Sequence, residues 1–298
     1  MFAYIIRRLV SAVLILLGVS VVTYALLYML PADPARQIAG RSATAETVAN
    51  IREQLGLNLP FGNLLTGDFG RSYLQKTEVG ELIAARLPAT LLLMGGAIFC
   101  ELVMGLTAGA VGAIKRNTPI DRGLMVASFV GVSAPQFVVG ILMLYLFAVV
   151  LGWFPIGGYG TFSHLVLPSI SMGFLGAGWY SRMMRSSMLD VLRQDYVRTA
   201  RAKGLGRARV FFVHAFPNAL LPIIAMIGID IGMFMSGIVV VESVFGWPGI
   251  GQLAWQAIQR VDIPIIMGVT LVSACAIVMG NLLADLVAPF IDPRIKLR

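Results

Sequence analysis

Apolar residues along this chain gather into six long runs, and short charged segments separate them. One bilayer crossing takes about 20 apolar residues, because a helix rises about 1.5 Å per residue and the hydrocarbon core is about 30 Å thick. All six runs come near that length or exceed it. The predicted spans are Leu9–Leu30, Pro88–Ile114, Gly123–Phe154, Leu165–Ser181, Ala215–Val241 and Ile263–Ala284. The pattern predicts an all-α, polytopic membrane protein with about six transmembrane helices.

Details inside the runs refine this picture. Leu9–Leu30 carries no charge over 22 residues, longer than the apolar part of a signal peptide, so we interpret it as an uncleaved span. Gly123–Phe154 is long enough for one span and a helical extension. Pro135 predicts a bend in that run, and Pro168 predicts one in the next. The next run also contains three glycines that predict a helix-packing face, namely Gly173, Gly176 and Gly178.

Composition supports a membrane protein. Hydrophobic residues make up 58% of the chain and charged residues 13%, whereas a soluble domain carries about 25% charged residues. The net charge is +8, which in a soluble protein would indicate nucleic-acid binding. Here the Lys and Arg residues lie in the short segments between apolar runs. We therefore expect the lipid bilayer as a partner and no nucleic acid.

The positions of the basic residues predict the orientation, because Lys and Arg gather in cytoplasmic segments. With the N-terminus in the cytoplasm, 16 of the 23 basic residues fall in cytoplasmic segments. Both termini are then cytoplasmic, in agreement with an even number of spans. The predicted parts are residues 1–30 with the first span, an extracytoplasmic segment 31–87, a five-helix core 88–291 with a cytoplasmic helix 186–206, and a tail 292–298.

Two short helices are predicted outside the spans. Thr44 is a suitable N-cap for Ala45–Leu55, whose apolar residues recur on one face, so a small helix on the outer surface is expected. Between the last two spans, Gly246–Gly251 is a strong turn signal. An amphipathic helix, Gln252–Arg260, follows it.

The sequence contains none of the residue sets that catalysis or metal binding would need. It has no GxxxxGK[ST] phosphate loop, no HExxH or CxxC spacing and no Ser/His/Asp set. Cys100 and Cys275 lie in apolar runs and indicate no disulfide framework. We therefore expect no enzyme activity, no bound cofactor and no metal. A stand-alone secondary transporter is a minor alternative; an inverted repeat would support it, and none is visible.

Two acids interrupt the apolar runs, Glu101 in the second span and Asp230 in the fifth. A charge at mid-bilayer costs about 2.5–3.5 kcal/mol on insertion scales, so such residues usually face the protein interior or water. Two interpretations stay open. Both acids line a translocation path and meet a substrate amine or a metal cation, or both are hydrogen-bonded acids that support helix packing.

The segment Arg182–Arg209 is too long for a simple connector and carries eight basic residues against two acids. Apolar residues recur at helical spacing in it, small residues follow, and Gly204 is expected to end the helix. One interpretation is a basic face held against anionic lipid. The other is a docking helix for a cytoplasmic partner.

The residues Asp195-Tyr196-Val197-Arg198-Thr199-Ala200-Arg201-Ala202-Lys203-Gly204-Leu205, with His214-Ala215-Phe216-Pro217 after them, resemble the EAA motif of bacterial ABC importer permeases. They are most similar to the B-type permease subunits of dipeptide, oligopeptide, glutathione and nickel importers. Further signatures of that family follow in order: Arg7-Arg8-Leu9, Leu30–Ala35, Gly67–Ser72, Leu167-Pro168-Ser169, Val241–Gly251 and Asp292–Ile295.

The resemblance implies the type I ABC importer permease fold in a bacterial cytoplasmic (inner) membrane. It implies a second homologous permease subunit, two ATPase subunits that bind ATP and Mg, and an extracytoplasmic solute-binding protein. The implied cargo is a di- or oligopeptide, with glutathione or nickel chelates as alternatives. The implied ATPase-coupling residues are Asp195, Tyr196, Arg198, Thr199, Ala200, Arg201, Ala202, Lys203 and Gly204. The implied contacts of the binding protein are Trp247, Pro248 and Gly249.

This chain departs from the family pattern at several positions. Arg198 stands where the general motif has an acid, and Phe216 stands where it has leucine. The stretch Leu59–Leu65 is shorter than is usual. Glu101 and Asp230 are not expected from the pattern.

Overall fold

The computed structural model describes residues 2–29, 34–40, 43–54, 67–72 and 74–291. This part of the chain is mostly helical, and its one isolated β-bridge pairs Arg71 with Glu78. The helices are α1 (Phe2–Met29), α2 (Pro34–Ala39), α3 (Ala45–Gln54), α5 (Val79–Ile114), α6 (Pro119–Ser133), α7 (Gln136–Met143), the π-helix η1 (Leu144–Val150), α8 (Phe162–Val191), α9 (Asp195–Ala202), α10 (Arg207–Arg209), the π-helix η2 (Val210–Ala215), α11 (Phe216–Ala219), α12 (Leu221–Gly237), α13 (Val239–Val244), α14 (Ile250–Arg260) and α15 (Ile263–Ile291). The predicted all-α class is confirmed.

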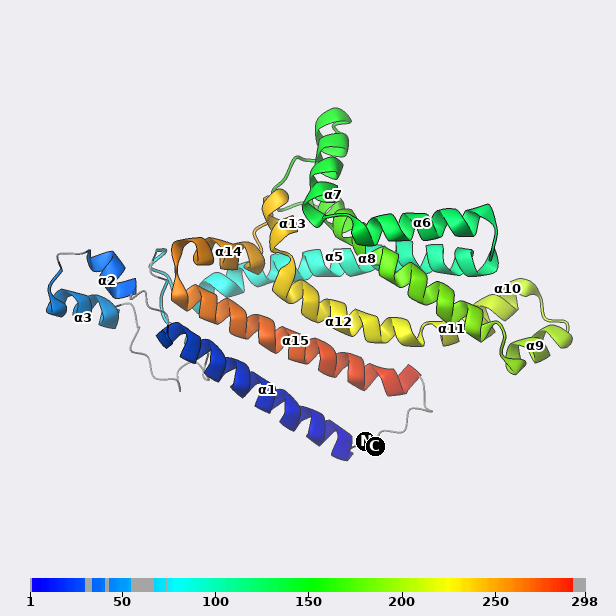
Figure 1. The fold of residues 1–298 in the computed structure, drawn as a ribbon, viewed down its shortest axis with the longest axis horizontal. Helices are drawn as coiled ribbons and strands as arrows, with labels where there is room; N and C mark the ends of the chain where they lie inside the picture. Colours follow the sequence, from blue (N-terminus) through cyan, green and yellow to red (C-terminus); the bar gives the residue numbers. More distant parts are fainter. Residues whose placement is uncertain (1, 30–33, 41–42, 55–66, 73, 292–298) are drawn as a thin grey trace.

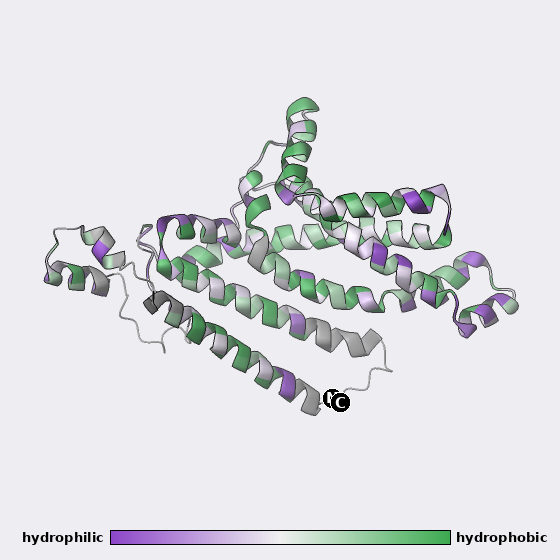
Figure 2. Ribbon diagram, viewed as in Figure 1, coloured by the Kyte–Doolittle hydropathy of each residue, from purple (hydrophilic) through white to green (hydrophobic). Residues whose placement is uncertain are grey.

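The long helices lie side by side in a bundle (Figure 1). α5 packs along α8, α12 packs along α15, and α1 lies against α15. One end of the bundle holds α9 and α10, and α1 begins and α15 ends toward the same end; the other end holds α14, α2 and α3. Figure 2 shows apolar residues along the bundle and hydrophilic residues gathered at α9 and α10.

Small residues let α8 approach its neighbours closely. A Cβ at Gly173 would lie 2.3 Å from the Cβ of Cys100 on α5. One at Gly178 would lie 2.4 Å from the backbone oxygen of Ser128 on α6. Neither distance is possible for real atoms, so a larger residue would push the helices apart. The predicted packing role of these glycines is confirmed, as is common in membrane bundles.

The run Gly123–Phe154 was predicted as one span with a helical extension and a bend at Pro135, and it forms two helices that meet at a sharp bend. α6 ends at Ser133, α7 begins at Gln136, and the axis bends by 107° between them. Pro135 explains the break, because its ring disfavours the helical conformation for Ala134, which is extended with ψ of 131°. α7 and η1 therefore project away from the bundle, while α6 stays packed on α8 (Figure 1).

Five of the six predicted spans correspond to described helices or bent helix pairs that are long and apolar enough to cross a membrane. Among the described residues, three helices are long and apolar enough to cross a membrane: Ile6–Ala25, Val79–Ile114 and Ile263–Leu282. Two bent pairs raise the number to five when each counts as one span: Pro119–Ser133 with Gln136–Val150, and Arg207–Ala219 with Leu221–Met235. The remaining predicted span, Leu165–Ser181, is helical within α8, but its serines and glycines lower its hydropathy.

The short helices outside the spans largely follow the prediction. Thr44 Oγ1 accepts a hydrogen bond from the backbone N–H of Thr47 at 3.3 Å, so Thr44 caps α3 as expected. α14 starts two residues earlier than predicted, at Ile250. α2 was not predicted. Leu55 and the stretch Leu59–Leu65 lie outside the described residues.

Candidate functional site

The basic segment after α8 folds into a hairpin of α9, α10 and η2. One helix was predicted over residues 186–206, and this is wrong: α8 ends at Val191, and Gln194, with ψ of 148°, turns the chain before α9. The turn brings Val197 and Ala200 into a buried cluster with the end of α8 and the start of η2. A straight helix would leave these apolar side chains in water, so their burial explains the break.

The outer face of α9 is polar and exposed. Eight of the nine predicted coupling residues are exposed, six of them on α9 and two just past its end: Asp195, Tyr196, Arg198, Thr199, Arg201, Ala202, Lys203 and Gly204. The ninth, Ala200, is buried beneath the helix, so it supports the helix and presents no outer surface. Gly204 adopts a left-handed φ of 78° just past the end of α9, as predicted for a helix stop.

The charges of the hairpin are accessible to a partner. Arg198 Nη1 lies 3.6 Å from Asp195 Oδ1, yet both side chains are exposed, so this pair contributes little stability. Arg201 and Lys203 are exposed as well. The hairpin therefore offers a net basic surface on a packed apolar base.

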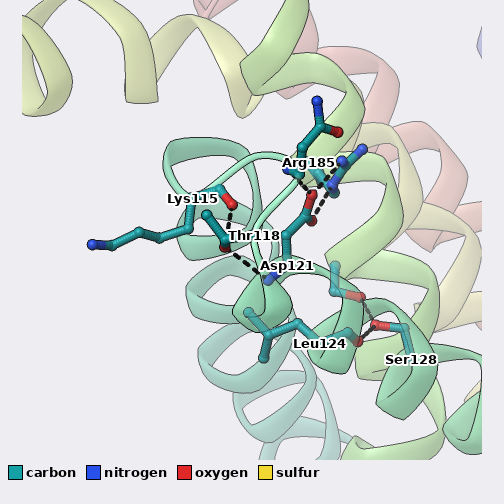
Figure 3. Close-up of polar contacts among 8 residues, drawn as sticks. Lys115, Thr118, Asp121, Leu124, Ser128 and Arg185 are labelled. Carbon is teal, nitrogen blue, oxygen red and sulfur yellow. Dashed lines mark hydrogen bonds and ion pairs between the residues drawn. The ribbon is translucent and has the colours of Figure 1, made fainter.

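An ion pair ties α6 to the part of α8 that leads into the hairpin (Figure 3). Arg185 donates from Nε and Nη2 to the two carboxylate oxygens of Asp121, at 2.6 and 2.7 Å. The backbone N–H of Asn117 adds a third bond to Asp121 at 2.8 Å. The hydrogen bond to Asp121 raises the pKa of Arg185, so the guanidinium stays charged. This pair was not predicted, because no local pattern shows that residues 64 positions apart meet.

A cavity of about 370 Å³ lies among α5, α8, α12 and the break between α6 and α7. Both predicted path acids line it, Glu101 from α5 and Asp230 from α12. Their carboxyl groups lie within hydrogen-bonding reach of each other. Tyr180 of α8 donates its hydroxyl to Asp230 Oδ2. Tyr180 was not predicted, because a tyrosine near the end of an apolar run is ordinarily an interfacial residue.

The close approach of α8 to Glu101 depends on Gly176, where a Cβ would lie 1.7 Å from Glu101 Oε1. The rest of the lining is mainly apolar and aromatic. It comprises Val132, Ala134, Gln136, Met172, Leu175, Gly176, Trp179, Met226, Ile229, Met233 and Phe234. The cavity is therefore an apolar chamber with two acids and a phenol on its walls.

The predicted binding-protein contacts fall in a buried corner between α13, α14 and α5. Trp247 is 1% exposed, and its Nε1 donates to the backbone oxygen of Ala89 at 2.8 Å. Gly249 is buried, and a Cβ there would lie 1.8 Å from Glu242 Oε1. A surface role for Trp247 and Gly249 does not fit this structure, because neither reaches the surface. Pro248 is half-buried.

Glu242 explains why that corner needs its particular residues. Its fully buried carboxylate accepts from Thr90 Oγ1 at 2.9 Å and from the backbone N–H of Gln252 at 2.7 Å. Thr90 Oγ1 accepts in turn from the N–H of Ile250 at 2.9 Å. The carboxylate thus satisfies the start of α14, where free N–H groups favour a negative charge. Sequence reasoning had no role for Glu242.

These features define a class: the membrane-embedded subunit of a transporter, with an internal cavity and a polar hairpin at the end of its bundle. The chain belongs to the family of binding-protein-dependent transport system inner membrane components. The family profile matches residues 102–297, and the profile of the family's N-terminal region matches residues 1–67. The predicted resemblance and the inner-membrane location are therefore confirmed.

Relatives match along the whole chain. The oligopeptide transport system permease protein AppB of Bacillus subtilis is 40% identical over 315 residues, covering 99% of this chain and 100% of that protein. The glutathione transport system permease protein GsiC of Escherichia coli K12 is 37% identical over 304 residues, covering 99% of each. A chain of the inward-facing MetNI methionine ABC transporter has the same fold, with a TM-score of 0.61 at 17% identity over 70% of this chain and 96% of that one.

Proposed function

We propose that this chain is the permease subunit of an ATP-driven importer that carries small peptides, di- and oligopeptides, across the cytoplasmic membrane. The observation that carries this proposal is the α9 hairpin, an exposed basic helix on an apolar base in a member of this family. The full-length identity to an oligopeptide permease supports the cargo.

Glutathione is the second candidate cargo, because a glutathione permease is nearly as similar over the same length. Glutathione is itself a small peptide, so one chamber suits both. Nickel chelates stay the other alternative that the family resemblance implies.

ATP-driven import needs other subunits to bind ATP, because this sequence has no phosphate loop. The proposed assembly adds a second homologous permease, two ATPase subunits that bind ATP and Mg, and an extracytoplasmic binding protein. Both termini are proposed to be cytoplasmic, since α9, the start of α1 and the end of α15 lie toward the same end of the bundle (Figure 1). The division into residues 1–30, 31–87, 88–291 and 292–298 belongs to the same proposal.

Coupling is proposed to run along α8. This helix continues unbroken from Tyr180 at the cavity to Val191 at the hairpin, a distance of about 16 Å at 1.5 Å per residue. Between these two points, Arg185 of α8 is bound to Asp121 of α6. The other end of α6 reaches the cavity, because Val132 lines it. A movement of the hairpin is thereby transmitted to two walls of the cavity as one body. Glu101 and Asp230 are proposed to line the path of the cargo.

A proposed contact of the binding protein falls on the opposite end of the bundle. Pro248 is the only one of the three predicted contacts with appreciable exposure, and the neighbouring helix α14 presents an exposed Trp255. These two residues are the proposed contacts, and the buried Trp247 holds the corner in place.

A Gly204→Trp substitution in the assembled transporter tests the coupling role. A non-glycine residue pays about 1–2 kcal/mol in the left-handed conformation, so the end of α9 is expected to rearrange. Uptake per ATP hydrolysed should fall about tenfold in proteoliposomes. ATP hydrolysis itself should persist, because it takes place on other subunits.

Gly206→Ala is the matched control. Gly206 has a φ of −60°, and a Cβ there meets no atom within 4 Å, so uptake should stay unchanged. Normal uptake by an assembled Gly204→Trp complex would contradict the coupling role. Uptake by the purified chain alone would instead support the secondary-transporter alternative.

A further inference from the structure

One oxygen at the cavity has no hydrogen-bond partner. Glu101 is 2% exposed, and its Oε2 is buried without a donor. Among the described residues, the acid that it faces is Asp230, whose Oδ2 already receives the hydroxyl of Tyr180. A buried polar atom without a partner is costly, so the pair needs either a proton shared between the two carboxyl groups or a donor from a ligand.

Glu242 shows what a purely structural acid looks like in the same protein. It is equally buried, and it receives hydrogen bonds from Thr90 and from the backbone of Gln252. No cavity touches it among those described. Glu101 lines a cavity and lacks such donors, so support of helix packing does not account for its surroundings.

The residues that line the cavity carry no positive charge to balance its two acids. Among the residues that line it, Glu101 and Asp230 are acidic, and none is Lys, Arg or His. Arg182, three residues after Trp179 on α8, stacks on the Trp179 ring at 4.5 Å and on Phe129 at 5.2 Å, and it does not line the cavity. Two carboxyl groups in contact can relieve their repulsion by sharing a proton, and even then a net negative charge remains.

The other walls suit a cation. Trp179, Tyr180 and Phe234 are aromatic, and aromatic rings attract ammonium groups, most strongly away from water. An ammonium group carries three donors and no acceptor, which matches a wall that presents two acids. A metal ion fits less well, since the described residues contain no third carboxylate, His or Cys ligand beside the two acids.

We propose that Glu101, Asp230 and Tyr180 form a binding site for a positively charged amino group of the cargo. This inference rests on the proposed function, because the cargo must enter the cavity during import. The amino terminus of a peptide is such a group, and so is the free amine of glutathione. The bound ammonium would donate to the carboxyl pair of Glu101 and Asp230, which lines the cavity, while Tyr180 holds the carboxyl of Asp230 in position.

The experiment uses the assembled transporter, with the second permease and the ATPases, in lipid nanodiscs. Dicyclohexylcarbodiimide, which modifies carboxyl groups in apolar surroundings, is the probe, and mass spectrometry follows labelling of Glu101 and Asp230. Butylammonium is then compared with 1-butanol, which has the same chain and no charge. At ten times its dissociation constant, butylammonium should slow the labelling about tenfold, whereas butanol should leave it unchanged.

Two controls give the result its meaning. Glu242 has its donors and lies away from the cavity, so butylammonium should not change its labelling. In a Glu101→Gln complex, the labelling of Asp230 should lose its protection by the amine. Three outcomes would overturn the site: butanol slows the labelling as much as butylammonium does, butylammonium does not slow it, or neither Glu101 nor Asp230 is labelled.

The labelling result is independent of import. Protection in a complex that imports no peptide would leave the amine site standing and overturn the proposed function. If a complex imports peptide but butylammonium gives no protection, the proposed function stands and the amine site is overturned.

Discussion

At the scale of single residues, two buried glutamates with different surroundings carry most of the information. Glu242 receives hydrogen bonds from two helices, through Thr90 of α5 and through the backbone N–H of Gln252 at the start of α14. Glu101 lines a cavity beside a second acid, Asp230, within hydrogen-bonding reach of it. The first stabilises the fold, and the second is the acid proposed to bind the cargo.

Gly249→Ala tests how strongly the corner of Glu242 depends on close packing. The added Cβ would lie 1.8 Å from Glu242 Oε1 and 2.1 Å from its Cδ, so the carboxylate must move away from the start of α14. Overpacking of this kind costs about 1–3 kcal/mol. We expect a lower unfolding temperature of the purified protein in detergent.

Gly95→Ala in α5 is the matched control for that substitution. A Cβ at Gly95 meets no atom within 4 Å, and alanine favours the helix by about 1 kcal/mol. Its unfolding temperature should be unchanged or higher. A Gly249→Ala protein as stable as the Gly95→Ala protein would show that Glu242 can move at no cost.

Residue types indicated candidates, but they did not indicate contacts. An acid within an apolar run is unusual enough to mark Glu101 and Asp230 from the sequence alone. Their contact with Tyr180 depends on how α5, α8 and α12 pack, and no local pattern contains that. Trp247 misled for a related reason, because an aromatic residue in a turn signature can be an exposed contact or a buried anchor.

At the scale of helices, the chain breaks where local chemistry and burial require it. Pro135 was a visible signal and divides α6 from α7. The break between α8 and α9 had no such signal, because residues 186–203 contain neither glycine nor proline. Burial of Val197 and Ala200 in a long-range cluster causes that break, so helical periodicity alone predicted a single helix.

Asp121→Asn tests whether the ion pair holds α6 on α8. The substitution weakens the two charge-assisted hydrogen bonds from Arg185, and each bond to a charged group is worth about 1.5–3 kcal/mol. The Arg185 side chain is 23% exposed, so water partly offsets the loss. We expect a marked loss of thermal stability and a loss of uptake per ATP hydrolysed. The double variant Asp121→Asn/Arg185→Gln should recover part of the stability.

Arg122→Gln is the control on the same helix, because Arg122 is exposed. It should leave both stability and uptake unchanged. If Asp121→Asn behaves like Arg122→Gln, α6 is held by apolar packing alone and the ion pair has no mechanical role.

At the scale of the whole molecule, the membrane setting and the family followed from the sequence, because apolar runs and ordered signatures extend over nearly all of the chain. The span Leu165–Ser181 was the least certain from hydropathy, since α8 is long and helical but only weakly apolar. The cavity could not be predicted at all. It depends on side chains from four parts of the sequence meeting around one space.

The unbroken helix α8 has a thermodynamic consequence. It joins the cavity at Tyr180, the proposed site of the cargo, to the hairpin after Val191, the proposed docking site of an ATPase. Whenever two binding sites are linked, each changes the affinity of the other by the same factor. If engagement of the hairpin by an ATPase weakens cargo binding tenfold, bound cargo must weaken that engagement tenfold as well. The ATPase would then sense whether the chamber is occupied through the same helix by which it acts.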